Sequence, residues 1–177
     1  MNRRKVEIVN NLADKFRECF QLHIPINIKE LINIVRILDG KIKVVEDINF
    51  GVSMNLNDDS SFIIKIPKME KNEMKYIIVY MLGHLMLYSN KFGANRDKKI
   101  FCKNNYSYEE DFFAQQFAVS LLMPKNKYYQ ILNKNTNQYE VVDIQSMANY
   151  FEVSKSAIIQ RGKDLGVVTE YSTINPQ

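Results

Sequence analysis

The apolar residues in the first forty positions follow the spacing of two amphipathic helices. Between residues 4 and 20 they recur every three or four positions, which places them on one helical face that we expect to pack on a core. A second helix is predicted from Ile28 to Leu38, after a break at Pro25 and before a stop at Asp39-Gly40. The inward positions of the first helix are Val6, Val9, Leu12, Ala13, Phe16 and Phe20, and those of the second are Leu31, Ile32, Val35 and Leu38.

Three shorter runs of apolar residues come next and have the character of strands. They span residues 41–45, 52–56 and 62–66, and the second run alternates apolar and polar positions. The polar stretch 57–61 supplies a turn between the second and third runs. We therefore predict a small three-stranded antiparallel sheet.

The rest of the chain is predicted to be mainly helical. One apolar helix covers residues 74–88, with Asn72 as a candidate N-cap, and another begins after the capping box of Ser107 and Glu110 and ends at Pro124. Residues 143–153 form a third predicted helix, which is followed by a tight turn and by another helix capped by Ser154. This order resembles a helix-turn-helix.

The predicted fold class is α+β, and its organisation has three parts. These are an N-terminal helix (1–24), a main domain (25–135) and a C-terminal helical segment (136–177) packed on the same core. The chain has 177 residues, enough for one well-formed core.

Composition and charge narrow the function classes. The net charge of +4, from 24 basic and 20 acidic residues, is mild, so it calls for no nucleic-acid partner. Two cysteines make no disulfide framework and fit a reducing compartment. No apolar run is long enough for a membrane span, and no signal core follows the basic start. We expect a cytoplasmic protein with no membrane association.

The candidate chemistry lies in the segment Tyr80-Met81-Leu82-Gly83-His84. A zinc protease with the His-Glu-x-x-His motif holds the metal with two imidazoles one helical turn apart, and the glutamate between them acts as general base. Only the second imidazole, His84, is present here. Tyr80 stands at the first His position and Met81 at the base position, and a thioether cannot accept a proton.

Together with a second helix, this segment resembles the ImmA/IrrE family of metallopeptidase-like proteins. That family pairs a His-Glu-Leu-Gly-His helix with a helix of the form Glu…Ala-Asn-x-Phe-Ala…Leu-Leu-Met-Pro. The resemblance covers about residues 25–168 and implies a zincin-like domain of a phage or mobile element. The matching residues are Leu82, Gly83, His84, Ala114, Phe117, Ala118, Leu121, Leu122, Met123 and Pro124.

The departures from that family's pattern predict a protein without peptidase activity. The residue before Ala114, near the family's third ligand, is Phe113, and the closest acids are Glu110 and Asp111. A catalytic zinc site needs three protein ligands and an open position. We expect no catalytic residue, no metal and no other cofactor. Tyr80 and His84 should instead be structural, with the tyrosine hydroxyl bonded to a ring nitrogen or to a nearby acid.

Two further features concern binding. A basic stretch in the loop of residues 90–105 could contact an acidic partner surface; its cations are Lys91, Arg96, Lys98, Lys99 and Lys103. The second helix of the helix-turn-helix-like segment carries Lys155, Gln160, Arg161 and Lys163, but residues 143–177 hold four acids against three bases and Gly162 should interrupt the helix. This favours a structural role for the segment.

These observations favour a catalytically inactive regulatory protein that binds a protein partner, and the resemblance implies a helix-turn-helix repressor as that partner. Two alternatives stay open. One is a metallopeptidase with an altered site, in which zinc is held by His84, Asp111 and Tyr80 and Glu110 serves as base. The other is a DNA-binding regulator that uses the C-terminal helices and the basic loop.

Overall fold

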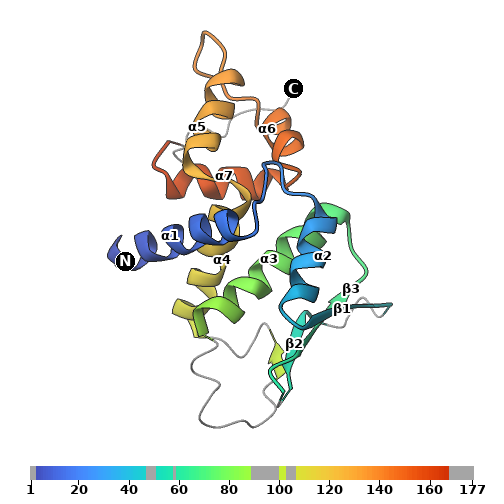
Figure 1. The fold of residues 1–177 in the computed structure, drawn as a ribbon. Coiled ribbons are helices and arrows are strands. Elements are labelled where there is room, and N and C mark those ends of the chain that lie inside the picture. Colours follow the sequence, from blue (N-terminus) through green and yellow to red (C-terminus); the bar gives the residue numbers. More distant parts are fainter. Residues whose placement is uncertain (1–2, 47–50, 58, 89–99, 103–106, 168–177) are drawn as a thin grey trace.

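The computed structural model describes residues 3–46, 51–57, 59–88, 100–102 and 107–167. In these ranges, helices form most of the molecule and a small sheet lies at one side (Figure 1), so the α+β class is confirmed. The elements are α1 (Arg3–Cys19), α2 (Ile28–Ile37), β1 (Gly40–Val45), β2 (Ser53–Leu56), β3 (Phe62–Pro67), α3 (Lys71–Tyr88), β4 (Ile100–Cys102), α4 (Tyr108–Leu122), α5 (Lys125–Lys134), α6 (Ile144–Phe151) and α7 (Lys155–Asp164).

The two N-terminal helices agree with the apolar pattern. In α1 the side chains of Val9, Ala13 and Phe16 are buried, and α2 buries Leu31 and Val35. Helix α2 begins with a capping box, in which the side chain of Asn27 accepts from an amide of the first turn and Glu30 accepts from the amide of Asn27.

The sheet differs from the predicted three-stranded antiparallel arrangement. It has four strands in the order β1-β3-β2-β4, and β1 runs parallel to β3, with Gly40 opposite Phe62 and Val45 opposite Pro67. The hairpin of β2 and β3 is antiparallel as predicted. Because β2 already occupies one edge of β3, β1 pairs with the other edge, and there it runs in the same direction as β3.

The turn before β1 also differs from the prediction. Asp39, not Gly40, has the left-handed backbone conformation, with φ of 61°. Gly40 is the first residue of β1, and a Cβ atom at this position would lie 2.3 Å from the Phe62 ring. Glycine is therefore required here by the close approach of Phe62 and not by the end of α2.

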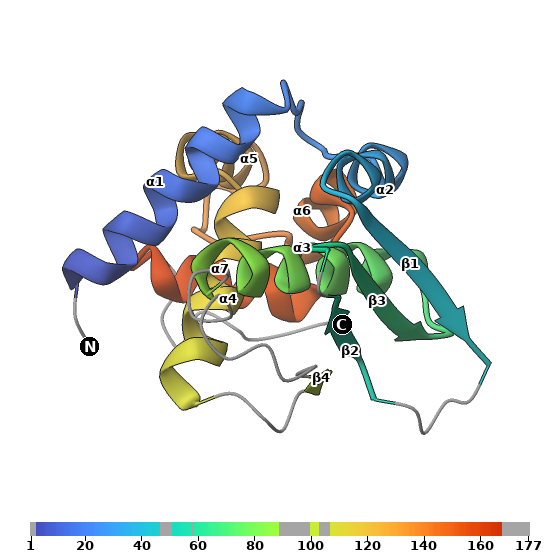
Figure 2. The ribbon, with the colours of Figure 1, turned by 60° about the horizontal axis from the view of Figure 1, so that its bottom comes forward.

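Helix α3 lies at the centre of the molecule, with the sheet and α2 toward one of its ends (Figure 2). It packs against α4, α2 and β3. It begins at Lys71, so Asn72 lies inside its first turn and not at its N-cap. Helix α4 begins with the predicted capping box of Ser107 and Glu110. The buried core joins side chains from the N-terminal helices, the sheet, α3 and the C-terminal helices, including Val9, Ile64 and Ile158.

The C-terminal helices form the predicted helix-turn-helix arrangement. Ser154 caps α7, and Glu152 in the turn adopts a left-handed conformation with φ of 52°. Gly162 does not interrupt α7; it lies buried within it. The sequence pattern missed α5, which starts directly after Pro124 and buries Tyr128, Ile131 and Leu132.

Candidate functional site

The three residues of the altered motif lie on α3 and are all buried. Met81 and His84 have no exposed surface and Tyr80 is 4% exposed. The rings of Tyr80 and His84 are in edge-to-face contact, with centroids 4.7 Å apart and an angle of 86° between their planes. The two side chains therefore project to the same side of the helix, as their spacing of four residues predicts.

The hydroxyl of Tyr80 donates a hydrogen bond to the carboxylate of Asp111 on α4. The other oxygen of this carboxylate accepts from Nε2 of Gln115 at 2.6 Å. Of the two partners that the sequence allowed for the hydroxyl, a ring nitrogen or a nearby acid, this bond is made with the acid. A phenol and a carboxylate thus hold α3 and α4 together where the family motif would place metal ligands.

Burial controls the protonation of the imidazole. It lowers the pKa of His84 from 6.5 to about 4, against the opposing effect of the Asp111 and Glu110 carboxylates, which favour the charged ring. Burial also raises the pKa of Tyr76 to about 12. At neutral pH the His84 imidazole is therefore neutral and the Tyr76 phenol is protonated.

The second acid proposed for an altered metal site, Glu110, belongs to the start of α4. One of its carboxylate oxygens accepts from the amide of Ser107 at 3.1 Å, and its own amide donates to the Ser107 hydroxyl at 3.2 Å. This carboxylate therefore takes part in capping the helix. It is still close enough to His84 to act on the pKa of the imidazole.

The described side chains around His84 do not form a set of zinc ligands. In the part of the chain that the structure describes, no three His, Cys, Asp or Glu residues lie together as a potential metal-binding group. Tyr80 is in contact with Asp111, so the altered site offers a phenol, a carboxylate and an imidazole. A neutral phenol is a poor zinc ligand, and this donor set does not fit a catalytic zinc site with three good ligands.

The residues that match the family pattern serve packing. A Cβ atom on Gly83 would lie 3.0 Å from the backbone oxygen of Ala114 and 3.1 Å from the Phe117 ring. Glycine thus permits the close approach of α3 to α4. The other matching positions of these helices that are fully or almost fully buried are Leu82, Ala114, Phe117, Ala118, Leu121, Leu122 and Met123.

Two buried cations were not expected to lie in the interior. Lys75 on α3 has no exposed surface, and its ammonium donates to the carbonyl oxygens of Phe151 at 2.9 Å and Ile26 at 3.3 Å. Arg161 on α7 is 2% exposed and donates to the Met123 carbonyl at 3.0 Å and the Ser120 hydroxyl at 3.1 Å. No local pattern marks these two residues, because their acceptors are distant in the sequence.

The surface of α7 differs from the sequence expectation in one respect. Arg161, a candidate for contact with DNA, faces the interior. The residues of α7 that are exposed to solvent are Lys155, Ser156, Gln160, Lys163 and Asp164, and Gln160 donates to the Asp164 carboxylate at 2.9 Å.

The basic residues proposed for partner binding belong to the loop of residues 90–105. Lys91, Arg96, Lys98, Lys99 and Lys103 lie outside the described residues. Among the helices that are described, none combines the length and apolarity required to cross a bilayer.

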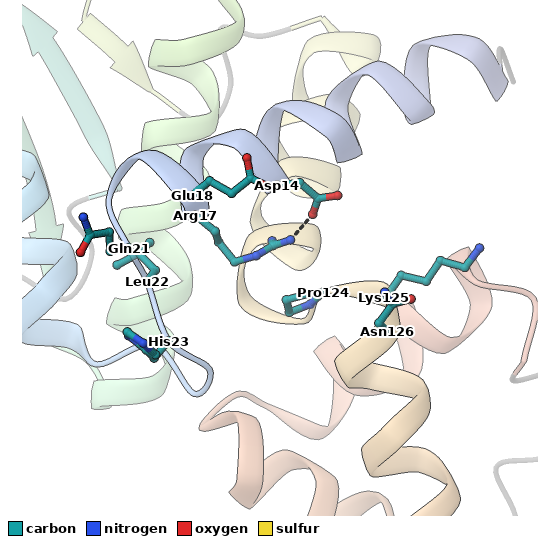
Figure 3. A pocket seen from close by; sticks show the side chains of 9 residues that line it. All are labelled: Asp14, Arg17, Glu18, Gln21, Leu22, His23, Pro124, Lys125 and Asn126. Carbon is teal, nitrogen blue, oxygen red and sulfur yellow. Dashed lines mark hydrogen bonds and ion pairs between the residues drawn. The ribbon is translucent and has the colours of Figure 1, made fainter.

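A wide polar pocket of about 710 Å³ lies between the end of α1, the following turn and the start of α5 (Figure 3). Its charged side chains include Arg17, which is paired with Asp14 and donates to the Ser120 carbonyl at 2.8 Å. Arg17 is therefore occupied in joining α1 to α4. The pocket is lined by Asp14, Arg17, Glu18, Gln21, Leu22, His23, Pro124, Lys125 and Asn126.

Comparison with known proteins gives a likeness at the level of fold. No protein-family model and no curated protein matches this chain. Among solved structures, a Mycobacterium tuberculosis transcriptional regulator is similar, with a TM-score of 0.61 and 12% sequence identity over 88% of this chain and 46% of that chain. At this identity the likeness shows the fold alone, and this chain spans less than half of the regulator's length.

Proposed function

We propose that this chain is a catalytically inactive regulatory protein of the cytoplasm, which binds a protein partner and does not cleave it. The observation that carries the proposal is the hydrogen bond from Tyr80 to Asp111. It joins the first-ligand position of the motif to the nearest acid of α4. The Tyr80 hydroxyl and the Asp111 carboxylate are thereby bonded to each other. In a peptidase the residues at these places would bind a metal.

The loss of the general base supports the same proposal. Hydrolysis by a metallopeptidase needs a metal-polarised water and a base beside it. Met81 is buried at the base position and has no basic atom. Glu110, the alternative base, caps α4. The packing between α3 and α4, in contrast, is close. The fold can therefore still present a surface that binds a protein partner, although the residues for hydrolysis are missing.

The nature of the partner rests on resemblance. ImmA/IrrE-like proteins of phages and mobile elements act on helix-turn-helix repressors, which makes such a repressor the first partner to test. The fold is also shared with a protein described as a transcriptional regulator, which agrees with a role in regulation.

The test incubates the purified chain, prepared without a His tag, with its captured partner in the presence and absence of Zn²⁺, and follows both chains by intact mass. We expect the partner to stay whole while it remains bound. Fragments that depend on metal and disappear with a chelator and in His84→Ala would disprove the proposal.

Metal analysis provides an independent readout. We expect the parent chain to carry no stoichiometric zinc. Replacing both motif positions, as Tyr80→His with Met81→Glu, would supply a second imidazole one turn from His84 and a base beside it, so this variant should gain affinity for zinc. About one tightly held zinc per parent chain, lost in His84→Ala, would contradict the proposal.

A second candidate function is DNA binding through α6 and α7. The observation in its favour is the helix-turn-helix arrangement, in which Lys155, Gln160 and Lys163 of α7 face solvent. Duplex binding that weakens steeply with salt and is lost in Lys155→Glu with Lys163→Glu would support it. Binding that is weak at low salt and indifferent to these substitutions would exclude it.

A further inference from the structure

A second pocket, of about 270 Å³, lies where the first half of α1 meets the end of α3 and the start of α4. Leu87 in its wall follows His84 by one turn of α3, so the pocket adjoins the altered motif. Its interior is largely apolar. The lining residues are Lys5, Ile8, Val9, Leu87, Ser107, Glu109, Glu110 and Phe113.

Large apolar side chains are exposed on α1 and α4, two of the helices that line this pocket. Ile8, which contributes to the lining, is 58% exposed. Tyr108, next to Glu109 in the first turn of α4, is 90% exposed. Exposed aliphatic and aromatic side chains are typical anchors of protein–protein interfaces, and Ile8 stands at the pocket itself.

An ion pair spans the pocket from one helix to the other. The ammonium of Lys5 on α1 contacts the carboxylate of Glu109 on α4 and lies 5.8 Å from the centre of the Phe113 ring. The two side chains are 50% and 60% exposed, so the pair is screened by water and contributes little to stability. A cation from a partner can therefore replace Lys5 at Glu109 at small cost.

The charge of the lining determines what kind of partner fits. Two carboxylates, Glu109 and Glu110, stand against one ammonium, Lys5, which gives a net charge of −1. The Glu109 carboxylate, which is 60% exposed, can attract a basic side chain of a protein partner. The walls are formed by helices, and a groove between helices receives an amphipathic helix through apolar anchors on one of its faces.

We infer that this pocket is the docking site for a short amphipathic helix of a protein partner. The helix inserts one apolar side chain beside Ile8 and Phe113, and it sets a lysine or arginine, one helical turn away, against Glu109. This inference rests on the proposed function, because it assigns a surface to the binding of a protein partner.

The probe is a phage-displayed library of helical peptides, selected on the full chain and measured as free peptides by fluorescence anisotropy. We expect the selected peptides to share an apolar residue and a lysine or arginine three or four positions apart. Ile8→Glu should weaken their binding at least about tenfold. Ile37→Glu is the matched control, because Ile37 is 59% exposed on α2, and it should leave binding unchanged.

Charge reversal tests the second half of the inference. Glu109→Lys should weaken the selected peptides, and replacing their basic residue with glutamate should restore binding to this variant but not to the parent chain. Tyr108→Ala, compared with Tyr139→Ala at another exposed tyrosine, gives a further readout if Ile8→Glu does not fold.

Three results would overturn the inference. The first is that the selected peptides bind the Ile8→Glu variant with the same affinity as the parent chain. The second is that the selected peptides are acidic. The third is that no peptide is enriched, while the chain binds anionic lipid vesicles and loses this binding in Ile8→Glu. The inference and the proposed function fail separately. A natural partner that binds Ile8→Glu with unchanged affinity rejects this surface and leaves the proposed function intact, whereas a partner cut into fragments rejects the proposed function.

Discussion

The two ends of α3 each bury a basic side chain, and they do so in opposite ways. Lys75 lies in the first half of the helix and His84 in the second, and neither has exposed surface. In both cases burial lowers the pKa, because removal from water disfavours the charged form. The surroundings of the two groups differ.

At the Lys75 end, the ammonium is surrounded by oxygen acceptors. It bonds the Phe151 carbonyl at the end of α6 and the Ile26 carbonyl before α2, and it lies 3.4 Å from the carboxylate of Glu152. A cation near the C-terminal end of a helix is favoured by the unpaired carbonyls there. Lys75 thus joins α3 to the end of α6 and to the segment before α2 through hydrogen bonds.

At the His84 end, the surroundings are aromatic and closely packed. The ring meets the edge of Tyr80, and the preceding residue, Gly83, allows the backbone of α4 to approach. One helix thus buries basic side chains in two ways. The Lys75 ammonium donates hydrogen bonds to carbonyl oxygens, whereas the His84 imidazole is neutral at pH 7. The four predictions below test this contrast, from the largest effect to the smallest.

Acid should destabilise the protein through His84. Because the folded pKa is about 4 and the ordinary value is 6.5, the unfolded chain binds a proton in this range that the folded chain does not. The stability is therefore fully present above pH 6.5 and is lost as the pH falls toward 4, by about 3 kcal/mol.

Urea unfolding between pH 8 and pH 4 measures this loss, and the His84 ring resonances in NMR should titrate with a midpoint near 4. The dependence should remain in His23→Gln, at an exposed histidine. A midpoint near 6.5 would show that the imidazole is not held neutral by burial.

Removing the cation at the other end should also be costly. Lys75→Met leaves two buried carbonyl oxygens without their donor, so we expect a loss of about 2.5 kcal/mol in the free energy of unfolding. Amide hydrogen exchange should accelerate in α6 and in the turn before α2, the segments that the ammonium joins.

Lys71→Met is the matched control, because Lys71 is exposed and lies 4.0 Å from the same Glu152 carboxylate. It should change stability by less than about 0.5 kcal/mol. Equal effects of the two substitutions would mean that the pairing with Glu152, and not the buried carbonyl contacts, carries the stabilisation.

Crowding should matter at the His84 end. Gly83→Val forces a branched side chain against the Ala114 backbone and the Phe117 ring, and we expect a loss of about 2 kcal/mol after the small gain in helix propensity. Gly51→Val should be nearly neutral, because a Cβ atom there meets nothing within 4 Å. Thermal unfolding of the two variants compares them directly, and equal stabilities would argue against close packing at Gly83.

The smallest effect is expected for the Tyr80 hydroxyl. Tyr80→Phe keeps the ring contact with His84 and removes the bond to Asp111, whose carboxylate still accepts from Gln115. The loss should be about 1 kcal/mol in urea unfolding. Tyr139→Phe, at an exposed tyrosine, should have no effect. An unchanged Tyr80→Phe would show that the bond to Asp111 does not contribute to the fold.

Local patterns were sufficient for most helices and for the contact between Tyr80 and His84. The periodicity of α1, the capping box of α4 and the cap of α7 at Ser154 depend on residues within a few positions of one another. Helix α5 was missed because Pro124 was interpreted only as the end of α4, although proline also fits the start of a helix.

The sequence by itself determined the α+β class, the lack of a second imidazole and of a base in the motif, and the position of the helix-turn-helix. The tertiary structure alone decided that β1 runs parallel to β3, that the Tyr80 hydroxyl bonds Asp111, and that Lys75 and Arg161 are buried. The physical reason is the range of the interactions. Helix periodicity and capping act between neighbours in the chain, whereas the acceptors of Lys75 and Arg161 lie dozens of residues away and become neighbours only when the helices pack.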